Sequence, residues 1–358
     1  MAFAVSSTIR WCSLHLALLF RLRPHPHLGH LAFPPEIILM IVAHLNKTSI
    51  ISLTLTCRTL FRICFPRSLE LSLSEKEDFL LLLEKDIAHL YFCYHCVKLH
   101  RWRTSWFHTR NHRVLTDLCC GIRCKQESHF SDGATYRLPY PSARVVMNRH
   151  FYGASHGVPA SKLDGWNVFR DIRFGAKVYN TTYARIIDDQ LMLSSVLTIS
   201  QAKGDAKLLR QFIDLDGPRV CHHLPTDSWS EQDHSWSERN HIHRIPELVR
   251  NNSLPDYFVS CSPSVKSCIV CLTDYCIDIG WHGRRKGWVI KIVTYRQLGA
   301  VRSPFHWNWS SMLYRLPQDG QRSLDPLRYR PGILRHMWSK ADEVLLEPGG
   351  DWVGESLA

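Results

Sequence analysis

The spacing of apolar residues changes along this chain, and that change limits the folds it can adopt. Between residues 34 and 83, apolar side chains recur every three or four positions, as on one face of an α-helix. Between residues 168 and 295, runs of β-branched and aromatic residues alternate with turn residues. We therefore predict an α+β protein, in which a small N-terminal helical hairpin precedes a mixed, mainly antiparallel β-rich domain.

Three helices are expected in the N-terminal part. The first begins at Pro34-Pro35-Glu36, because proline lacks only an N–H that would be unpaired in a first helical turn. The second extends from Ile50 to Cys64 and is ended by Pro66. The third opens with Ser74-Glu75-Lys76-Glu77, which has capping-box spacing. Helices this short bury little surface alone, so we expect them to dock on a partner or on the rest of the chain.

The central part of the chain predicts β-hairpins. Residues 188–190 form a break short enough for a hairpin between two strands, and the Gly- and Arg-rich segment 282–287 has the composition of a second turn. Residues 221–244 are polar and are expected to form a surface loop. The other expected elements are strands over 168–179 (broken at Gly175), 183–187 (after a break at Asn180), 191–199, 275–281 and 287–295, and helices over 206–213 and 333–344. Residues 145–151 could form a further strand, before Ser155.

Charge and hydropathy argue against two kinds of partner. The 44 Lys and Arg residues exceed the 32 Asp and Glu residues by 12, but they are scattered and form no basic tract. We therefore do not expect nucleic acid as a partner. No run approaches the roughly 18 apolar residues that a membrane helix needs, so no membrane partner is expected either.

The N-terminal residues allow two interpretations. Residues 1–35 contain no acidic residue, and Arg10, Arg21 and Arg23 flank a short apolar run. We favour a disordered extension over residues 1–30, with a cytoplasmic or nuclear location for the protein. An Arg-rich mitochondrial presequence is the alternative.

The cysteines suggest a structural zinc site. With 13 Cys and 21 His, the chain resembles an intracellular protein with free thiols and metal ligands more than a secreted disulfide framework. Two pairs, Cys93-x2-Cys96 and Cys268-x2-Cys271, have the spacing that lets both sulfurs reach one ion. All four could share one zinc. In a more local set, Cys93 and Cys96 would be joined by ligands from His100, Cys119, Cys120 and Cys124. In a third interpretation these cysteines are buried thiols without metal.

One motif formally matches a hydrolase. Gly153-x-Ser155-x-Gly157 has the pattern of a nucleophile elbow, which requires a strand directly before the serine and a helix directly after it. Pro159 lies where the second turn of that helix would run, and no alternating βα pattern follows. We therefore expect a turn at this position and no enzymatic activity.

The N-terminal helices resemble an F-box. The resemblance rests on Leu31-x-Phe33-Pro34-x-Glu36-Ile37 with Ile41 and Leu45, followed after a polar break by Leu53 and Cys57-Arg58-x-Leu60-Phe61. Phe33 occupies a position where the family usually has leucine. Later segments extend the resemblance to fungal F-box proteins of unassigned substrate. These segments are 91–102, 143–153, 268–275 and 298–307.

The resemblance implies the substrate-recognition subunit of a cullin–RING ubiquitin ligase of the SCF type. Residues 31–66 would be the F-box, 67–315 an α+β domain that binds an unknown target protein, and 316–358 a mostly disordered tail. The residues implied to contact the ligase adaptor subunit are Pro34, Glu36, Ile37, Ile41, Leu45, Leu53 and Leu60. The alternative is a zinc-stabilised protein-binding or nucleic-acid-binding protein, in which the helical hairpin is only part of the core.

Overall fold

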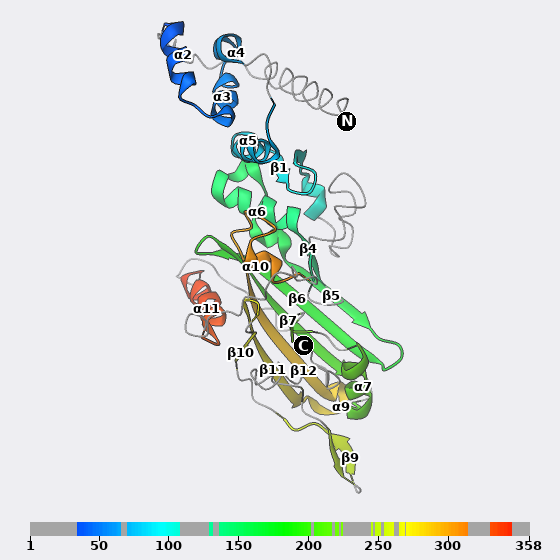
Figure 1. The fold of residues 1–358 in the computed structure, drawn as a ribbon. Helices are drawn as coiled ribbons and strands as arrows, with labels where there is room; N and C mark the ends of the chain where they lie inside the picture. Colours follow the sequence, from blue (N-terminus) through cyan, green and yellow to red (C-terminus); the bar gives the residue numbers. More distant parts are fainter. Residues whose placement is uncertain are drawn as a thin grey trace. The chain divides into compact units, whose positions relative to one another are not determined.

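The chain forms two compact units. The structure is a computed structural model that describes residues 34–65, 70–107, 129–131, 136–201, 204–216, 219–221, 223–224, 245, 248–251, 254–260, 265–268, 270–313 and 330–345. The expected extension over 1–30 lies outside these residues, as do 316–329 and 346–358 of the expected tail. One unit ends at Leu71 and the other begins at Ser72. We call them the helical unit and the body. The predicted α+β class is confirmed (Figure 1).

The helical unit has a small core of its own. It contains α2 (Pro35–Ala43), α3 (Lys47–Thr54) and α4 (Arg58–Cys64). Ile38, Leu60 and Cys64 are buried against one another. The single helix predicted from Ile50 to Cys64 is wrong, because the chain leaves the helical conformation at Cys57. The Cys57 sulfur there accepts a hydrogen bond from the Leu60 N–H and caps α4.

The body begins with α5 (Leu73–Asp86). Its capping box is formed by Ser72 and Glu75, two residues before the predicted pair. The hairpin of β1 (Leu90–Cys93) and β2 (Lys98–Arg101) follows. The other elements before the main sheet are the 3-10 segments 104–107, 154–156 and 160–163, β3 (His129–Ser131), β4 (Arg137–Pro139) and α6 (Tyr140–Tyr152).

Helix α6 covers residues 145–151, which we considered as a strand before Ser155. All residues from Ser142 to Asn148 are buried, so the sequence shows no polar face from which a helical period could be read. Pro141 in the first turn and Gly153 after the last, at φ 98°, are the signals that mark this helix.

Six antiparallel strands form the main sheet. Their order is β10 (Lys266–Ser267), β11 (Thr273–Trp281), β12 (Trp288–Gly299), β7 (Gln190–Gln201), β6 (Ala176–Ile187) and β5 (Gly165–Arg170). The predicted hairpin at 188–190 is confirmed, because Asp188 and Asp189 have φ of 49° and 60° and join β6 to β7. The predicted break at Asn180 is wrong, since this residue lies inside β6.

Further elements pack around the sheet. Figure 1 shows α11 (Ile333–Leu345) beside the strands, and α7 (Ala206–Asp216) near the end of the sheet that carries α9 (Gly283–Lys286). Helix α11 contributes the buried Leu334 and Trp338 to the main core, so this part of the expected tail belongs to the folded body. The remaining elements are β8 (Val249–Asn251), β9 (Leu254–Tyr257) and α10 (Trp307–Ser310).

A buried carboxylate fixes the start of α11. Asp274 on β11 is fully buried and accepts hydrogen bonds from the backbone N–H groups of Leu334, at 2.7 Å, and Arg335, at 3.2 Å. The hydroxyl of Ser267 donates to the same carboxylate. Asp274 therefore caps α11 from a neighbouring strand.

Replacing this carboxylate should loosen α11. In Asp274→Ala the buried N–H of Leu334 and the part-buried N–H of Arg335 lose their acceptor, and this loss costs about 1–3 kcal/mol for a buried N–H. Amide hydrogen exchange in α11 should therefore become faster, while exchange in β6 and β7 changes little. Asp278→Ala, on the same strand but half-buried, is the control and should leave α11 unchanged. Equal exchange in both variants would contradict the capping role.

Candidate functional site

The body brings cysteine and histidine side chains together in two groups. In each group the ligand atoms all lie within 4.8 Å of one another. The Cys3His group consists of Cys221, His223, Cys268 and Cys271, and the hairpin group consists of Cys93, Cys96 and His100. The prediction that Cys93, Cys96, Cys268 and Cys271 share one ion is therefore wrong, because the two pairs belong to different groups.

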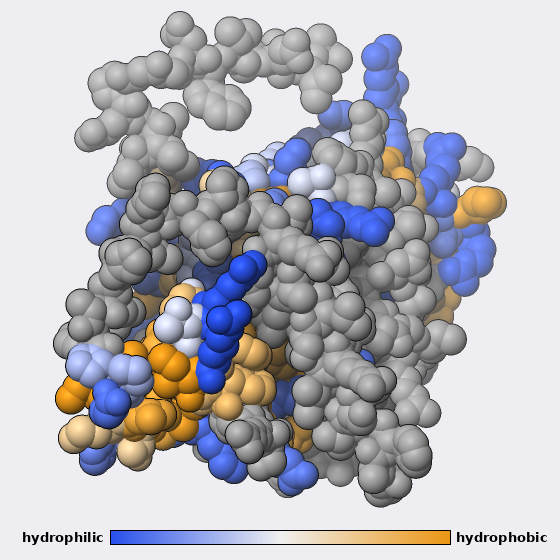
Figure 2. Space-filling view, turned by 90° about the horizontal axis from the view of Figure 1, so that it is seen from above, coloured by the Kyte–Doolittle hydropathy of each residue, from blue (hydrophilic) through white to orange (hydrophobic). Residues whose placement is uncertain are grey.

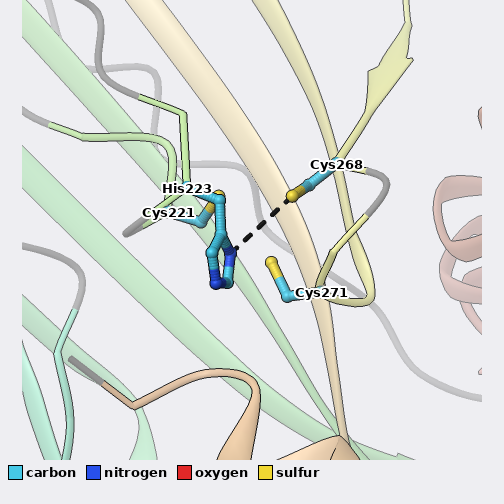
Figure 3. A group of neighbouring side chains, drawn as sticks. All are labelled: Cys221, His223, Cys268 and Cys271. Atoms are coloured by element: carbon cyan, nitrogen blue, oxygen red, sulfur yellow. Dashed lines mark hydrogen bonds between the residues drawn. The ribbon is translucent and has the colours of Figure 1, made fainter. Parts of the chain in front are cut away.

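Two segments far apart in the sequence form the Cys3His group (Figure 3). Cys268 and Cys271 lie in the short connection between β10 and β11, and the Cys268 N–H donates to the carbonyl of Thr273. Cys221 and His223 come from the segment after α7. The sulfur of Cys268 lies 3.8 Å from Nδ1 of His223. The three cysteines are buried, and His223 is half-buried.

The three thiols of this group differ in acidity. Burial raises the pKa of Cys221 and of Cys271 well above the usual value. The pKa of Cys268 is lowered well below it, because Cys221, Cys271 and His223 stabilise its thiolate by hydrogen bonds. The hydrogen bonds of the group therefore favour the thiolate form of Cys268 over that of the other two cysteines.

This arrangement fits a metal ion. Tetrahedral zinc bound to sulfur and nitrogen needs ligand atoms about 3.5–4 Å apart, which small movements within the observed 4.8 Å would achieve. The ring nitrogen of His223 that faces the Cys268 sulfur is Nδ1, at 3.8 Å, and Nδ1 can serve as a zinc ligand. Three cysteines and one histidine form a common structural zinc set. The Cys3His group can therefore hold a metal.

Our sequence prediction missed Cys221 and His223. The segment 221–244 was expected to be a surface loop, but Cys221 and Leu224 are buried. The available signal was the Cys-x-His spacing, which places two ligand types within reach of one ion. The polar residues around Cys221 and His223 favoured a loop prediction, so this spacing was not recognised.

The hairpin group is local. The sulfur of Cys96 lies 2.8 Å from Nε2 of His100 across the turn between β1 and β2. Cys93 ends β1, and the turn is closed by Val97 at a φ of 49°. His100 is thus found beside Cys93 and Cys96, as the local set predicted. Cys119, Cys120 and Cys124 of that set lie outside the described residues.

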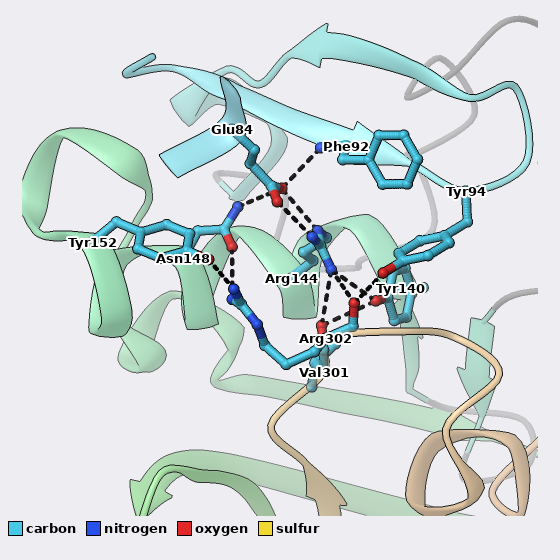
Figure 4. A network of polar contacts seen from close by, with 9 residues as sticks. All are labelled: Glu84, Phe92, Tyr94, Tyr140, Arg144, Asn148, Tyr152, Val301 and Arg302. Atoms are coloured by element: carbon cyan, nitrogen blue, oxygen red, sulfur yellow. Dashed lines mark hydrogen bonds and ion pairs between the residues drawn. The ribbon is translucent and has the colours of Figure 1, made fainter. Parts of the chain in front are cut away.

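A buried polar network lies beneath this hairpin (Figure 4). Glu84 of α5 and Arg144 of α6 are both fully buried and form an ion pair of 2.5 Å. Glu84 also accepts hydrogen bonds of 2.8 Å from the Phe92 N–H and from the amide of Asn148. The Tyr94 hydroxyl and the Arg144 guanidinium each donate to the carbonyl of Arg302, at 2.5 Å. The network joins α5, the hairpin, α6 and the segment after β12.

The helical unit exposes most of the residues predicted to contact an adaptor subunit. Ile37 is 41% and Ile41 is 48% exposed, and both lie on α2. Pro34 and Glu36 are also exposed, whereas Leu45 and Leu53 are half-buried. The prediction that Leu60 contacts the adaptor subunit is wrong, because Leu60 is 3% exposed and belongs to the core of this unit. Figure 2 shows hydrophobic side chains gathered in a patch on the face that it views.

The nucleophile-elbow pattern lacks its structural context. Ser155 follows the helix α6 instead of a strand, and it lies in a short 3-10 segment. Its hydroxyl contacts Nδ1 of the neighbouring His156 at 3.2 Å. An elbow requires the strand–serine–helix order, so the pattern is a turn.

Comparisons with models of protein families, with curated proteins and with solved structures found no match to this chain. Among the described helices, none is long and apolar enough to cross a membrane.

Proposed function

We propose that the protein is a substrate-recognition subunit of an SCF-type ubiquitin ligase, which docks on the adaptor subunit through the helical unit. The observation that carries this proposal is the apolar side of α2, where Ile37 and Ile41 are exposed although the unit has its own core. Contiguous exposed apolar side chains mark an interaction site. The resemblance to an F-box specifies the adaptor subunit as the partner.

The alternative, in which the helical hairpin is part of the body's core, is less well supported. The contacts separate the helical unit from the body at Leu71. In a core helix Ile37 and Ile41 would be buried. In our proposal the body binds a target protein and brings it to the ligase, so that this chain contributes proximity while other subunits transfer ubiquitin.

A double substitution on α2 tests this function. Ile37→Asp/Ile41→Asp should lower the affinity for the purified adaptor subunit at least about a hundredfold, because each unpaired carboxylate buried at an interface costs several kcal/mol. Isothermal titration calorimetry measures the affinity. Circular dichroism should show an unchanged helical content, because neither side chain belongs to the core of the unit.

Leu39→Asp is the matched control. Leu39 is 49% exposed, similar to Ile41, and at 100° per residue it lies on the opposite side of α2. This variant should retain adaptor binding. Unchanged binding of the double variant would overturn the proposed F-box function, and so would the absence of adaptor binding by the wild-type chain.

We further propose that the metal of the Cys3His group is zinc and that its role is structural. Thiolate and imidazole ligands favour zinc over magnesium or calcium, which prefer oxygen. Four protein ligands fill a tetrahedral ion and leave no position for a substrate. The zinc ion would tie the segment after α7 to the connection between β10 and β11.

A further inference from the structure

We propose that the hairpin group, Cys93, Cys96 and His100, binds a second metal ion. From the sequence we predicted a single zinc site, in which Cys93 and Cys96 bind together with Cys268 and Cys271 or with a local set that includes His100. The structure instead assembles two separate groups, each compact by itself. This inference goes beyond the proposed function, since it depends neither on adaptor binding nor on metal in the Cys3His group.

The geometry of the hairpin prepares the site. Cys93 is paired with Lys98 at the last position of the ladder, so Cys96 lies in the turn that follows. His100 is two residues further along β2 than Lys98, and side chains two apart on a strand point to the same face. The turn at Val97 brings the Cys96 sulfur to 2.8 Å from Nε2 of His100. Three ligand atoms therefore lie within 4.8 Å of one another.

The ligand types specify the class of metal. Two thiols and one imidazole suit a borderline-soft divalent ion such as zinc. Three ligands leave the fourth tetrahedral position to a donor that the described residues do not supply. Cys96 and His100 are half-buried, whereas three of the four ligands in the Cys3His group are buried. We therefore expect the hairpin ion to exchange faster.

The ion would stabilise a contact with the rest of the body. Tyr94 lies in the Cys93-x2-Cys96 turn, and its hydroxyl donates to the Arg302 carbonyl (Figure 4). Its ring also packs edge-on against Phe305, with centroids 6.0 Å apart. A metal bound on both sides of Tyr94 would hold the turn, and so this contact, in place.

Metal content measured on the full chain tests the proposal. We expect about two zinc ions per wild-type chain by mass spectrometry, and about one in Cys96→Ser and in His100→Ala. Cys268→Ser should lose the other ion and also contain about one, and Cys96→Ser/Cys268→Ser should contain none. Cys276→Ser, a half-buried thiol outside both groups, is the control and should keep both ions. On addition of a chelator, the wild type should release zinc in two phases, and only the fast phase should be absent from Cys96→Ser.

Two outcomes would overturn the inference. One is a wild-type chain with a single zinc ion that Cys96→Ser and His100→Ala retain and Cys268→Ser loses. That result would support the zinc site in the Cys3His group and contradict the hairpin site. The other is a purified wild-type chain that contains no zinc after it has been incubated with zinc under reducing conditions. That result would contradict both metal sites. If Cys268→Ser is the only variant that loses zinc, the Cys3His site is supported and the hairpin site is contradicted.

Discussion

Replacing Glu84 with alanine should destabilise the body by about 3–5 kcal/mol, because it leaves the fully buried Arg144 guanidinium without its counter-ion. The same change removes the acceptor of the Phe92 N–H and of the Asn148 amide. Urea unfolding followed by tryptophan fluorescence measures the effect, since all tryptophans except Trp11 follow Ser72.

A double variant separates the ion pair from the packing around it. Glu84→Leu/Arg144→Met should recover part of the lost stability, because similar-sized apolar residues can replace a buried pair at little cost. Asp78→Asn, an exposed carboxylate on the same helix, should change stability by less than about 0.5 kcal/mol. A loss in Glu84→Ala as small as that of Asp78→Asn would show that the pair is accessible to water in solution.

Replacing Cys271 with serine should release one zinc ion and lower the melting temperature of the body by about 8–16 °C. A ligand present at about a thousand times its Kd stabilises a protein by about 4 kcal/mol. For domains of 150–250 residues, each kcal/mol corresponds to about 2–4 °C. Differential scanning fluorimetry and metal analysis of the same sample measure both effects. A variant that keeps its zinc and its melting temperature would exclude Cys271 as a ligand.

The zinc affinity of this group should fall as the pH falls. Burial raises the pKa of Cys221 and Cys271, so zinc must displace a proton from each thiol to bind both. Below these pKa values the affinity should fall about tenfold per pH unit for each displaced proton. Competition with a chromophoric chelator at pH 8 and pH 6.5 measures the change. A pH-independent affinity would mean that neither thiol is a ligand.

Local signals allowed much of the fold to be predicted. The two-residue turn at Asp188 and Asp189 and the strands beside it follow from residues that are neighbours in the sequence. Cys268 and Cys271 could likewise be recognised as a ligand pair from their spacing. Each of these features depends on only a few consecutive residues, so one sequence suffices to detect it.

Features that depend on distant segments could not be predicted. No local pattern indicates that Cys221 and His223 face Cys268, because 44 residues separate His223 from Cys268. Glu84 and Arg144 are 60 positions apart, and each resembles an ordinary surface charge on a helix. Helix α6 is hard to recognise from the sequence for a related reason, since all residues from Ser142 to Asn148 are buried and form no exposed polar face.

The order of strands in the sheet has a consequence for biosynthesis. Strand β7 pairs with β6, its neighbour in sequence, but its other edge pairs with β12, which begins 87 residues after β7 ends. During translation the β5–β6–β7 meander can form while that edge of β7 has no partner. An unpaired apolar edge is a template for pairing with other chains. The nascent chain therefore passes through an aggregation-prone interval, which ends only when β12 has left the ribosome and closed the sheet.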